Sequence, residues 1–130
     1  NDASYIESMV FNSEGILGQI INESKFYEVL LLTDISHSLP IKLESNKFYC
    51  NAKGSGRAEY IICNYNPLIW TEVINVSQAV YTSGLGGVYP KDIEIGYVNS
   101  ILSIDSKEAR IEIKLLANPL NGSQFGVLNY

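Results

Sequence analysis

The chain has 130 residues, 46% of them hydrophobic, and a formal net charge of −5. This length allows one compact core or two very small barrels and excludes a larger architecture. The nine lysines and arginines are scattered singly, which argues against nucleic-acid binding, and no apolar run approaches the ~20 residues of a membrane-spanning helix. Because the sequence begins at Asn1 without an initiator methionine or a signal peptide, we interpret it as part of a longer protein.

Short strands separated by turn residues account for the first half of the chain. We expect strands at residues 5–11, 16–21, 26–33 and 39–43, and then a hairpin of residues 48–53 and 58–64. Gly18 lies inside the second strand, where an isolated glycine indicates a bulge or a close backbone approach. Pro40 is compatible only with an edge strand or a strand start, because it lacks the N–H that a central strand donates.

The two cysteines, Cys50 and Cys63, fall on the two strands of that hairpin. A turn at Gly54-Ser55-Gly56 would place Cys50 opposite residue 61 or 62. A disulfide needs a specific Cβ separation that a diagonal pair seldom offers, so we expect two buried free thiols, with a disulfide as the alternative.

The second half of the chain also indicates short strands. Residues 69–74 fit either a strand or one helical turn, and residues 93–104 are either one bent strand or two strands hinged near Gly96 or Asn99-Ser100. Residues 109–115 alternate apolar and charged side chains, and residues 124–128 end the pattern. About ten short strands and no substantial helix predict an all-β fold, a barrel or a sandwich.

A glycine-rich loop, Thr82 to Pro90, joins two of these strands. Its three glycines within four positions indicate a sharp turn or close backbone packing. A phosphate-binding loop would continue into a helix, whereas here Pro90 and a strand follow, so we interpret the loop as a structural corner.

The best catalytic set that the sequence offers is Asp34, His37 and Ser83, with Gly84 to Gly87 as an oxyanion loop. A triad requires the carboxylate to hold the far ring nitrogen of the histidine, which is difficult for an aspartate three residues away in the same loop. We therefore interpret His37 as an exposed loop residue and keep a small serine-protease-like hydrolase as the alternative function.

No ligand cluster has the spacing of a metal site, and nothing in the sequence indicates a cofactor. A small-ligand-binding barrel would need a cavity for which barrels of this size have little room. Nine tyrosines and one tryptophan, by contrast, favour protein contacts, so a binding surface is the leading functional class.

Four blocks in fixed order resemble the periplasmic region of the bacterial rod-shape-determining MreC family. They are Glu14 to Ile20, Leu31 to Ile41, Thr82 to Lys91 and Ile95 to Val98, and the Thr-Ser-Gly-Leu-Gly-Gly run in the third is the most specific. The chain departs from the family at Ser77-Gln78, where Gly-Asp is usual, and at Asp92, where glycine is usual. Both are turn positions, and aspartate enters the left-handed region at modest cost.

The resemblance implies two small, closely packed β-barrels and a non-catalytic scaffold of the cell-elongation machinery. It implies a location on the periplasmic side of the inner membrane, with the family's membrane helix and coiled coil absent from this sequence. Implied partners are the elongation transpeptidase, a class-B penicillin-binding protein that the scaffold would activate, other cell-shape proteins and a second copy of the chain.

Two further expectations concern the domains and the contact surface. Because closed β domains often pair their terminal strands, we assign residues 1–38 with 95–130 to one barrel and 39–94 to the other. For the contact surface we expect an exposed glycine-rich loop, with Leu85, Val88 and Tyr89, and as the next candidates the aromatic residues Tyr65 and Trp70.

Overall fold

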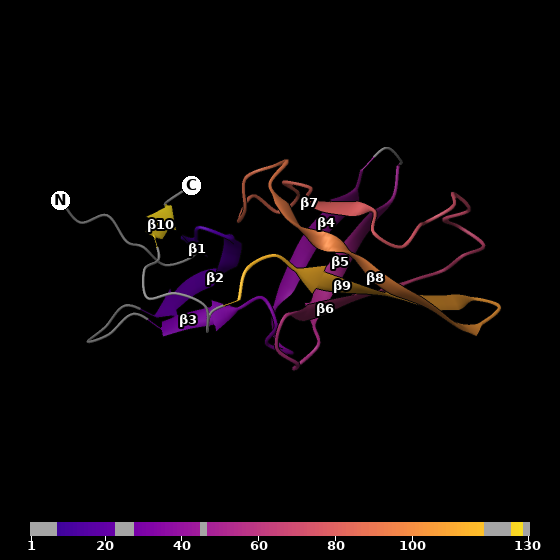
Figure 1. The fold of residues 1–130 in the computed structure, drawn as a ribbon, viewed down its shortest axis with the longest axis horizontal. Coiled ribbons are helices and arrows are strands. Elements are labelled where there is room, and N and C mark those ends of the chain that lie inside the picture. Colours follow the sequence, from indigo (N-terminus) through magenta and orange to yellow (C-terminus); the bar gives the residue numbers. More distant parts are fainter. Residues whose placement is uncertain (1–7, 23–27, 45–46, 119–125, 129–130) are drawn as a thin grey trace.

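The computed structural model describes residues 8–22, 28–44, 47–118 and 126–128 (Figure 1). These residues form ten strands and no helix, which confirms the all-β class, and none of them forms a segment able to cross a membrane as a helix. The strands are β1 (Met9–Asn12), β2 (Gly15–Asn22), β3 (Glu28–Leu31), β4 (Ser38–Leu43), β5 (Tyr49–Gly54), β6 (Tyr60–Tyr65), β7 (Ala79–Thr82), β8 (Glu94–Asp105), β9 (Glu108–Leu115) and β10 (Gly126–Leu128).

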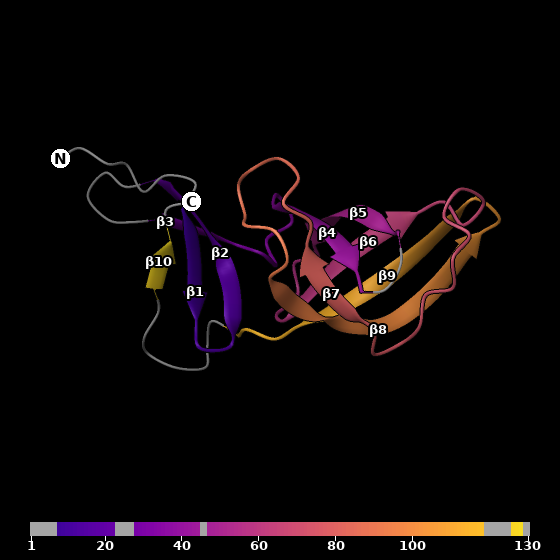
Figure 2. The same cartoon turned by 90° about the horizontal axis from the view of Figure 1, so that it is seen from above.

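Six strands close into a barrel in the order β4-β5-β6-β9-β8-β7, and four form a sheet in the order β10-β1-β2-β3. The two units lie side by side along the long axis of the molecule (Figures 1 and 2). The sequence-based division is wrong for β8 and β9, which belong to the same barrel as β4 to β7. Within the described residues the other unit is a four-stranded sheet, not a closed barrel.

The four-stranded sheet depends on Gly18. A Cβ on this residue would lie 2.0 Å from the carbonyl oxygen of Leu30 on the neighbouring strand. The register between β1 and β2 also shifts between Val10 and Phe11, opposite Gly18 and Ile16. Both observations confirm the expected close approach and bulge, which bend the strand.

The barrel core follows from strict alternation along its strands. On β9 the residues Ala109, Ile111, Ile113 and Leu115 are buried and the residues between them are partly exposed. Pro40 lies within β4, which is paired on both sides, so the expectation of an edge or a strand start is wrong. The pairing with β7 begins only at Ile41, and the carbonyl of Pro40 accepts the N–H of Ser83 at 3.1 Å.

Residues 94–105 form one long strand, with register shifts at Val98/Ser100 and Ser103/Asp105, so the bent-strand alternative is correct. All six residues from Ser100 to Asp105 are exposed. This half of β8 and its partner in β9 form an arm that extends beyond the rest of the barrel (Figure 1). The segment 66–78, where a strand or a helical turn was expected at 69–74, forms neither.

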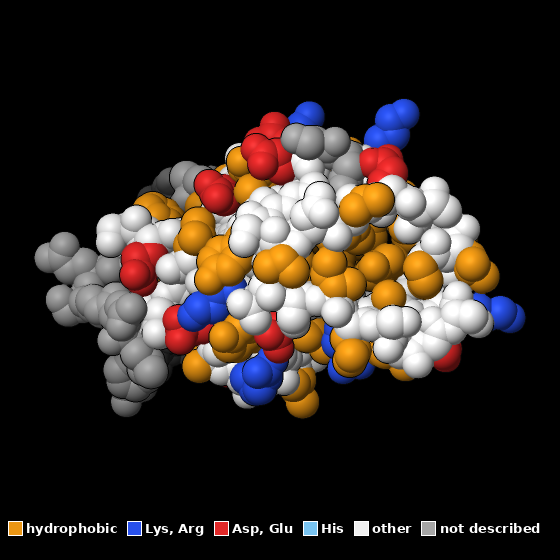
Figure 3. Space-filling view, turned by 45° about the vertical axis from the view of Figure 1, so that its right-hand side comes forward, with side chains coloured by type: hydrophobic (Ala, Val, Ile, Leu, Met, Phe, Trp, Pro, Cys, Tyr) orange, Lys and Arg blue, Asp and Glu red, His pale blue; other side chains and the backbone are white. Residues whose placement is uncertain are grey.

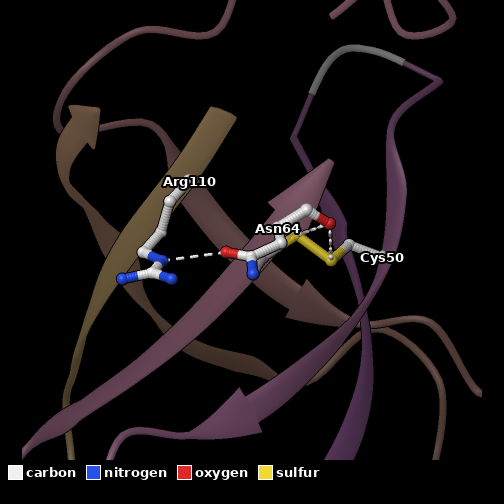
Figure 4. The surroundings of a disulfide bond; sticks show 4 residues. Cys50, Asn64 and Arg110 are labelled. Atoms are coloured by element: carbon white, nitrogen blue, oxygen red, sulfur yellow. Dashed lines mark hydrogen bonds between the residues drawn. A yellow bond between two sulfur atoms is a disulfide. The ribbon is translucent and has the colours of Figure 1, made fainter. Parts of the chain in front are cut away.

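Cys50 and Cys63 form a disulfide with a Cα–Cα distance of 6.3 Å, so the prediction of free thiols is wrong (Figure 4). The hairpin turn is longer than expected, and it places Lys53 opposite Ile62 and Gly54 opposite Ile61. Cys50 and Cys63 are therefore still a diagonal pair. Those two residue pairs are the whole β5–β6 register, so the disulfide joins the strands where backbone pairing has ended.

Candidate interaction surface

The glycine-rich loop between β7 and β8 is closed at its base by Thr82. The buried hydroxyl of this residue donates to the carbonyl of Pro90 at 2.6 Å and accepts the N–H of Ile93 at 2.8 Å. Gly84, Gly86 and Gly87 have φ values of 79°, 80° and 73°, which L-residues rarely adopt. The loop is therefore a fixed corner, as the sequence predicted.

The C-terminal side of this loop is anchored in the interior. Tyr89 is only 3% exposed, and its hydroxyl is 2.7 Å from Nε2 of His37, which is 1% exposed. Val88 is half-buried and packs against the core. Of the three loop residues expected to make contacts, only Leu85 has a largely exposed side chain, so the expectation of exposure is wrong for Tyr89.

Asp34, His37 and Ser83 do not form a triad. The Asp34 carboxylate accepts the backbone N–H of Ser36 at 2.8 Å and its hydroxyl at 2.7 Å, and these bonds lower its pKa. The Ser83 hydroxyl accepts the N–H of Leu85 at 3.2 Å. Burial lowers the pKa of His37 to about 4, and its Nδ1 has no hydrogen-bond partner among the described residues. The expectation of an exposed His37 is therefore wrong, and these residues give no support to the hydrolase alternative.

Tyr65 and Trp70 both pack against the same buried aromatic ring. Both rings pack edge-on against buried Phe48, with centroid distances of 5.2 Å for Tyr65 and 5.6 Å for Trp70. Tyr65 is half-buried and Trp70 is 36% exposed. Both candidate contact residues therefore use much of their side-chain surface for packing on Phe48, which leaves less of it for contact with a partner.

The segment 66–78 carries apolar side chains that sequence reasoning missed. Its exposed aliphatic residues are Leu68, Ile69, Val73 and Val76, with exposed fractions between 58% and 76%. Figure 3, in which the right-hand side of Figure 1 comes forward, shows a band of hydrophobic side chains across the face. The signal available in the sequence was an aliphatic-rich stretch after Asn66-Pro67 without clear strand or helix periodicity.

Leu85 lies over a groove on the outside of the barrel. The groove has a volume of about 340 Å³ and is lined by Pro40, Tyr49, Cys50, Asn51, Leu85 and Gly86. None of these side chains is charged. We call this feature the Leu85 groove.

The chain matches the family model described as "Rod shape-determining protein MreC, barrel core" over residues 2–129. The cell shape-determining protein MreC of Escherichia coli is 31% identical over 116 residues, which are 88% of this chain and 30% of that protein. This chain thus spans about a third of the length of that relative.

Two solved structures share the fold. The crystal structure of MreC from Pseudomonas aeruginosa superposes with a TM-score of 0.82 at 24% identity, covering 97% of this chain and 81% of that one. A complex between penicillin-binding protein PBP2 and MreC from Helicobacter pylori contains a chain that superposes with a TM-score of 0.65 at 17% identity, covering 88% of this chain and 69% of that one.

Proposed function

Because this chain belongs to the MreC family of rod shape-determining proteins, we propose that it is a non-catalytic scaffold of the bacterial cell-elongation machinery. In this proposal it lies on the periplasmic side of the inner membrane, where it binds and activates the elongation transpeptidase, a class-B penicillin-binding protein. The PBP2 complex of the related Helicobacter pylori protein supports a partner of this class.

The observation that carries the proposal is the exposed arm of β8 and β9. Its aliphatic side chains Ile101, Leu102 and Ile104 are 39%, 56% and 43% exposed, although the barrel closes without them. Exposed aliphatic side chains are unfavourable in water, and burying them against a partner lowers the free energy. Their exposure on the arm is therefore typical of a docking surface.

The outer face of the arm also presents polar groups in fixed positions. Leu102 lies opposite Arg110, whose guanidinium Nε donates to the Asn64 side chain at 2.9 Å. Glu112 pairs with Arg57 and accepts the Asn99 amide at 2.8 Å. These residues surround a hollow of about 240 Å³ lined by Ser55, Arg57, Ile62, Ser100, Leu102, Arg110 and Glu112. Ile62 and Leu102 supply the apolar part of this lining and the other five residues are polar or charged, and protein interfaces commonly combine such apolar and polar contacts.

Activation requires more than binding. The arm shifts the transpeptidase towards its active conformation only if it binds that conformation more tightly than the inactive one. A tenfold difference in affinity corresponds to about 1.4 kcal/mol, which one aliphatic side chain supplies if it is buried only against the active conformation.

The test is calorimetric titration of the purified chain into the soluble periplasmic part of the transpeptidase, together with an assay of peptidoglycan cross-linking. We expect saturable binding and faster cross-linking, both weakened at least about tenfold by Leu102→Asp. Ile21→Asp, which changes a 41% exposed aliphatic residue on β2 of the four-stranded sheet, is the matched control and leaves both unchanged. Equal effects of the two variants would argue against the arm, and no binding by the unmodified chain would argue against the function.

A further inference from the structure

The two sulfur atoms of the Cys50–Cys63 disulfide differ in accessibility. Cys63 is 0% exposed and belongs to the hydrophobic core of the barrel, whereas Cys50 is partly exposed and lines the Leu85 groove. Thiol–disulfide exchange requires a thiolate to reach one sulfur of the bond. From the groove a thiolate reaches the sulfur of Cys50, whereas core side chains cover that of Cys63.

The surroundings of Cys50 favour a thiolate that another protein carries. The groove has a volume of about 340 Å³, and none of the described residues that line it is charged. Tyr49 and Leu85 are 45% and 59% exposed, so they offer apolar surface on the walls of the groove. A chain with a net charge of −5 repels anions in general, but the described lining of this groove contains no carboxylate. The groove therefore offers an incoming thiolate apolar contacts without a negative charge in its walls.

Each cysteine is held by a different neighbouring strand. Cys50 lies opposite Ile41 on β4, and Cys63 lies opposite Ile111 on β9. Backbone pairing between β5 and β6 is confined to two residue pairs near their hairpin turn and does not include the cysteines. When the S–S bond breaks, Cys50 stays paired with β4 and Cys63 with β9, so a small movement of β5 relative to β6 separates the two sulfurs. A mixed disulfide on Cys50 thus forms without unfolding of the barrel.

The reduced cysteines have a hydrogen-bond acceptor in place. The backbone carbonyl oxygen of Asn64 lies 4.0 Å from the sulfur of Cys50 and 4.0 Å from that of Cys63 (Figure 4). Once the bond is reduced, a thiol S–H donates to this oxygen. The site therefore accommodates both the disulfide and the dithiol.

We propose that Cys50 is a thiol–disulfide exchange site for a thioredoxin-like protein, that is, a protein with a reactive pair of cysteines. In the reducing direction, a thiolate of that protein attacks Sγ of Cys50, the Cys50–Cys63 bond breaks, and Cys63 leaves as a thiolate that takes up a proton. The partner's second thiolate then attacks the partner's own sulfur in the mixed disulfide, which releases Cys50 as a thiolate that takes up a second proton. The chain gains two electrons and two protons, and the two thiols of the partner become a disulfide. Formation of the Cys50–Cys63 bond follows the same steps in reverse.

This exchange goes beyond the proposed function and uses a different part of the barrel. The groove is lined by residues of β4, of β5 and of the glycine-rich loop, whereas the proposed transpeptidase contact is the arm of β8 and β9. The exchange makes the stability of the barrel depend on a redox partner, because the disulfide joins β5 and β6 where their backbone pairing has ended.

Trapping of the mixed disulfide tests the proposal on the oxidised, unmodified chain. The probe, in excess, is thioredoxin in which the second cysteine of the reactive pair is replaced by serine, so that the reaction stops at the mixed disulfide. Free thiols are then blocked with iodoacetamide, and trypsin cleaves after Lys53 and Arg57, which puts Cys50 and Cys63 on different peptides. Mass spectrometry of the non-reduced digest is expected to show at least about tenfold more probe on Cys50 than on Cys63, since exchange follows access to the sulfur.

Opposite charges at Leu85 test whether the groove is the route to the sulfur. Leu85→Asp places a carboxylate beside the incoming thiolate and should slow reduction by unmodified thioredoxin about threefold, whereas Leu85→Lys should accelerate it about threefold, as expected for one unit charge across a small groove in water. A loss of packing would change both rates in the same direction. Ile21→Asp on β2 and Leu102→Asp on the arm are the controls, which are reduced at the rate of the unmodified chain.

The proposal is overturned if the probe joins Cys63 as often as Cys50, if no adduct forms on the folded chain, or if the two Leu85 variants change the rate in the same direction. Circular dichroism checks that each variant is folded. If a Leu85 variant is unfolded, the trapping experiment on the unmodified chain still gives the answer. Transpeptidase binding is measured separately with Leu102→Asp, so failure of the exchange and failure of the proposed function are distinguishable.

Discussion

Reduction of the Cys50–Cys63 disulfide is expected to lower the free energy of unfolding by about 3 kcal/mol. The two cysteines are 13 residues apart in sequence, and the chain-entropy model gives this value for a closed loop of that size. Other contacts compensate little, because the β5–β6 register consists of only two residue pairs. For a domain of 130 residues, such a loss corresponds to a decrease in Tm of roughly 10 °C.

The assay is urea unfolding at pH 7 of the oxidised chain, the reduced chain and the Cys50→Ala/Cys63→Ala variant, followed by circular dichroism. The denaturant slope should increase on reduction, because the unfolded chain without the cross-link exposes more surface. The double variant should resemble the reduced chain, with an additional loss of about 1 kcal/mol because the sulfur of Cys63 is fully buried. A difference below about 1 kcal/mol between the oxidised and reduced chains would refute the reasoning, since packing would then hold β5 and β6 together.

Three further predictions concern single residues. Burial lowers the pKa of His37 from 6.5 to about 4, so the unfolded chain binds the extra proton first and stability falls by at most about 3 kcal/mol as the pH drops from 7 to 4. Urea midpoints over this range should fall less steeply for His37→Gln, and parallel profiles would contradict the assignment. Gly86→Ala should cost about 1–2 kcal/mol, because its φ of 80° is unfavourable but nothing lies within 4 Å of an added Cβ, whereas Gly18→Ala should cost more, because its Cβ would lie 2.0 Å from a carbonyl oxygen. Thermal unfolding of both variants compares them, and equal Tm values would argue against the close approach. Ser77→Gly should stabilise the chain by up to about 1 kcal/mol, because Ser77 has a φ of 74°, and a lower Tm would show that the serine side chain stabilises this turn.

The strands were predictable because their signals are local. Alternation along residues 109–115 and the turn residues between apolar runs depend only on neighbours in sequence, and the structure has strands there. Gly18 was informative for the same reason, since a glycine inside a strand is disfavoured without a close contact.

Pairing between distant strands was not predictable in the same way. The assignment of residues 95–115 to the N-terminal unit failed because β8 and β9 pair with β7 and β6, and alternation does not specify a partner strand. The thiols were misjudged because Cys50 and Cys63, although still a diagonal pair, lie where the backbone pairing of β5 with β6 has ended, and their Cα atoms are only 6.3 Å apart. The exposure of Leu68 and Ile69 could not be predicted from the sequence either, because an aliphatic run without periodicity fits a core strand as well as an exposed turn.

The glycine-rich loop shows how a motif can resemble an active site and still be structural. Its Ser83 N–H donates to the carbonyl of Pro40, its Thr82 hydroxyl spans the loop base, and its Tyr89 hydroxyl meets a buried His37. Each of these polar groups is thus engaged inside the protein. Asp92, where the family usually has glycine, has a φ of 68° and still donates its N–H to Thr82 at 2.9 Å, so the loop base retains its hydrogen bonds despite the departure. What the loop offers to a partner is therefore not a reactive group but the position of Leu85, which its three positive-φ glycines project over an uncharged groove.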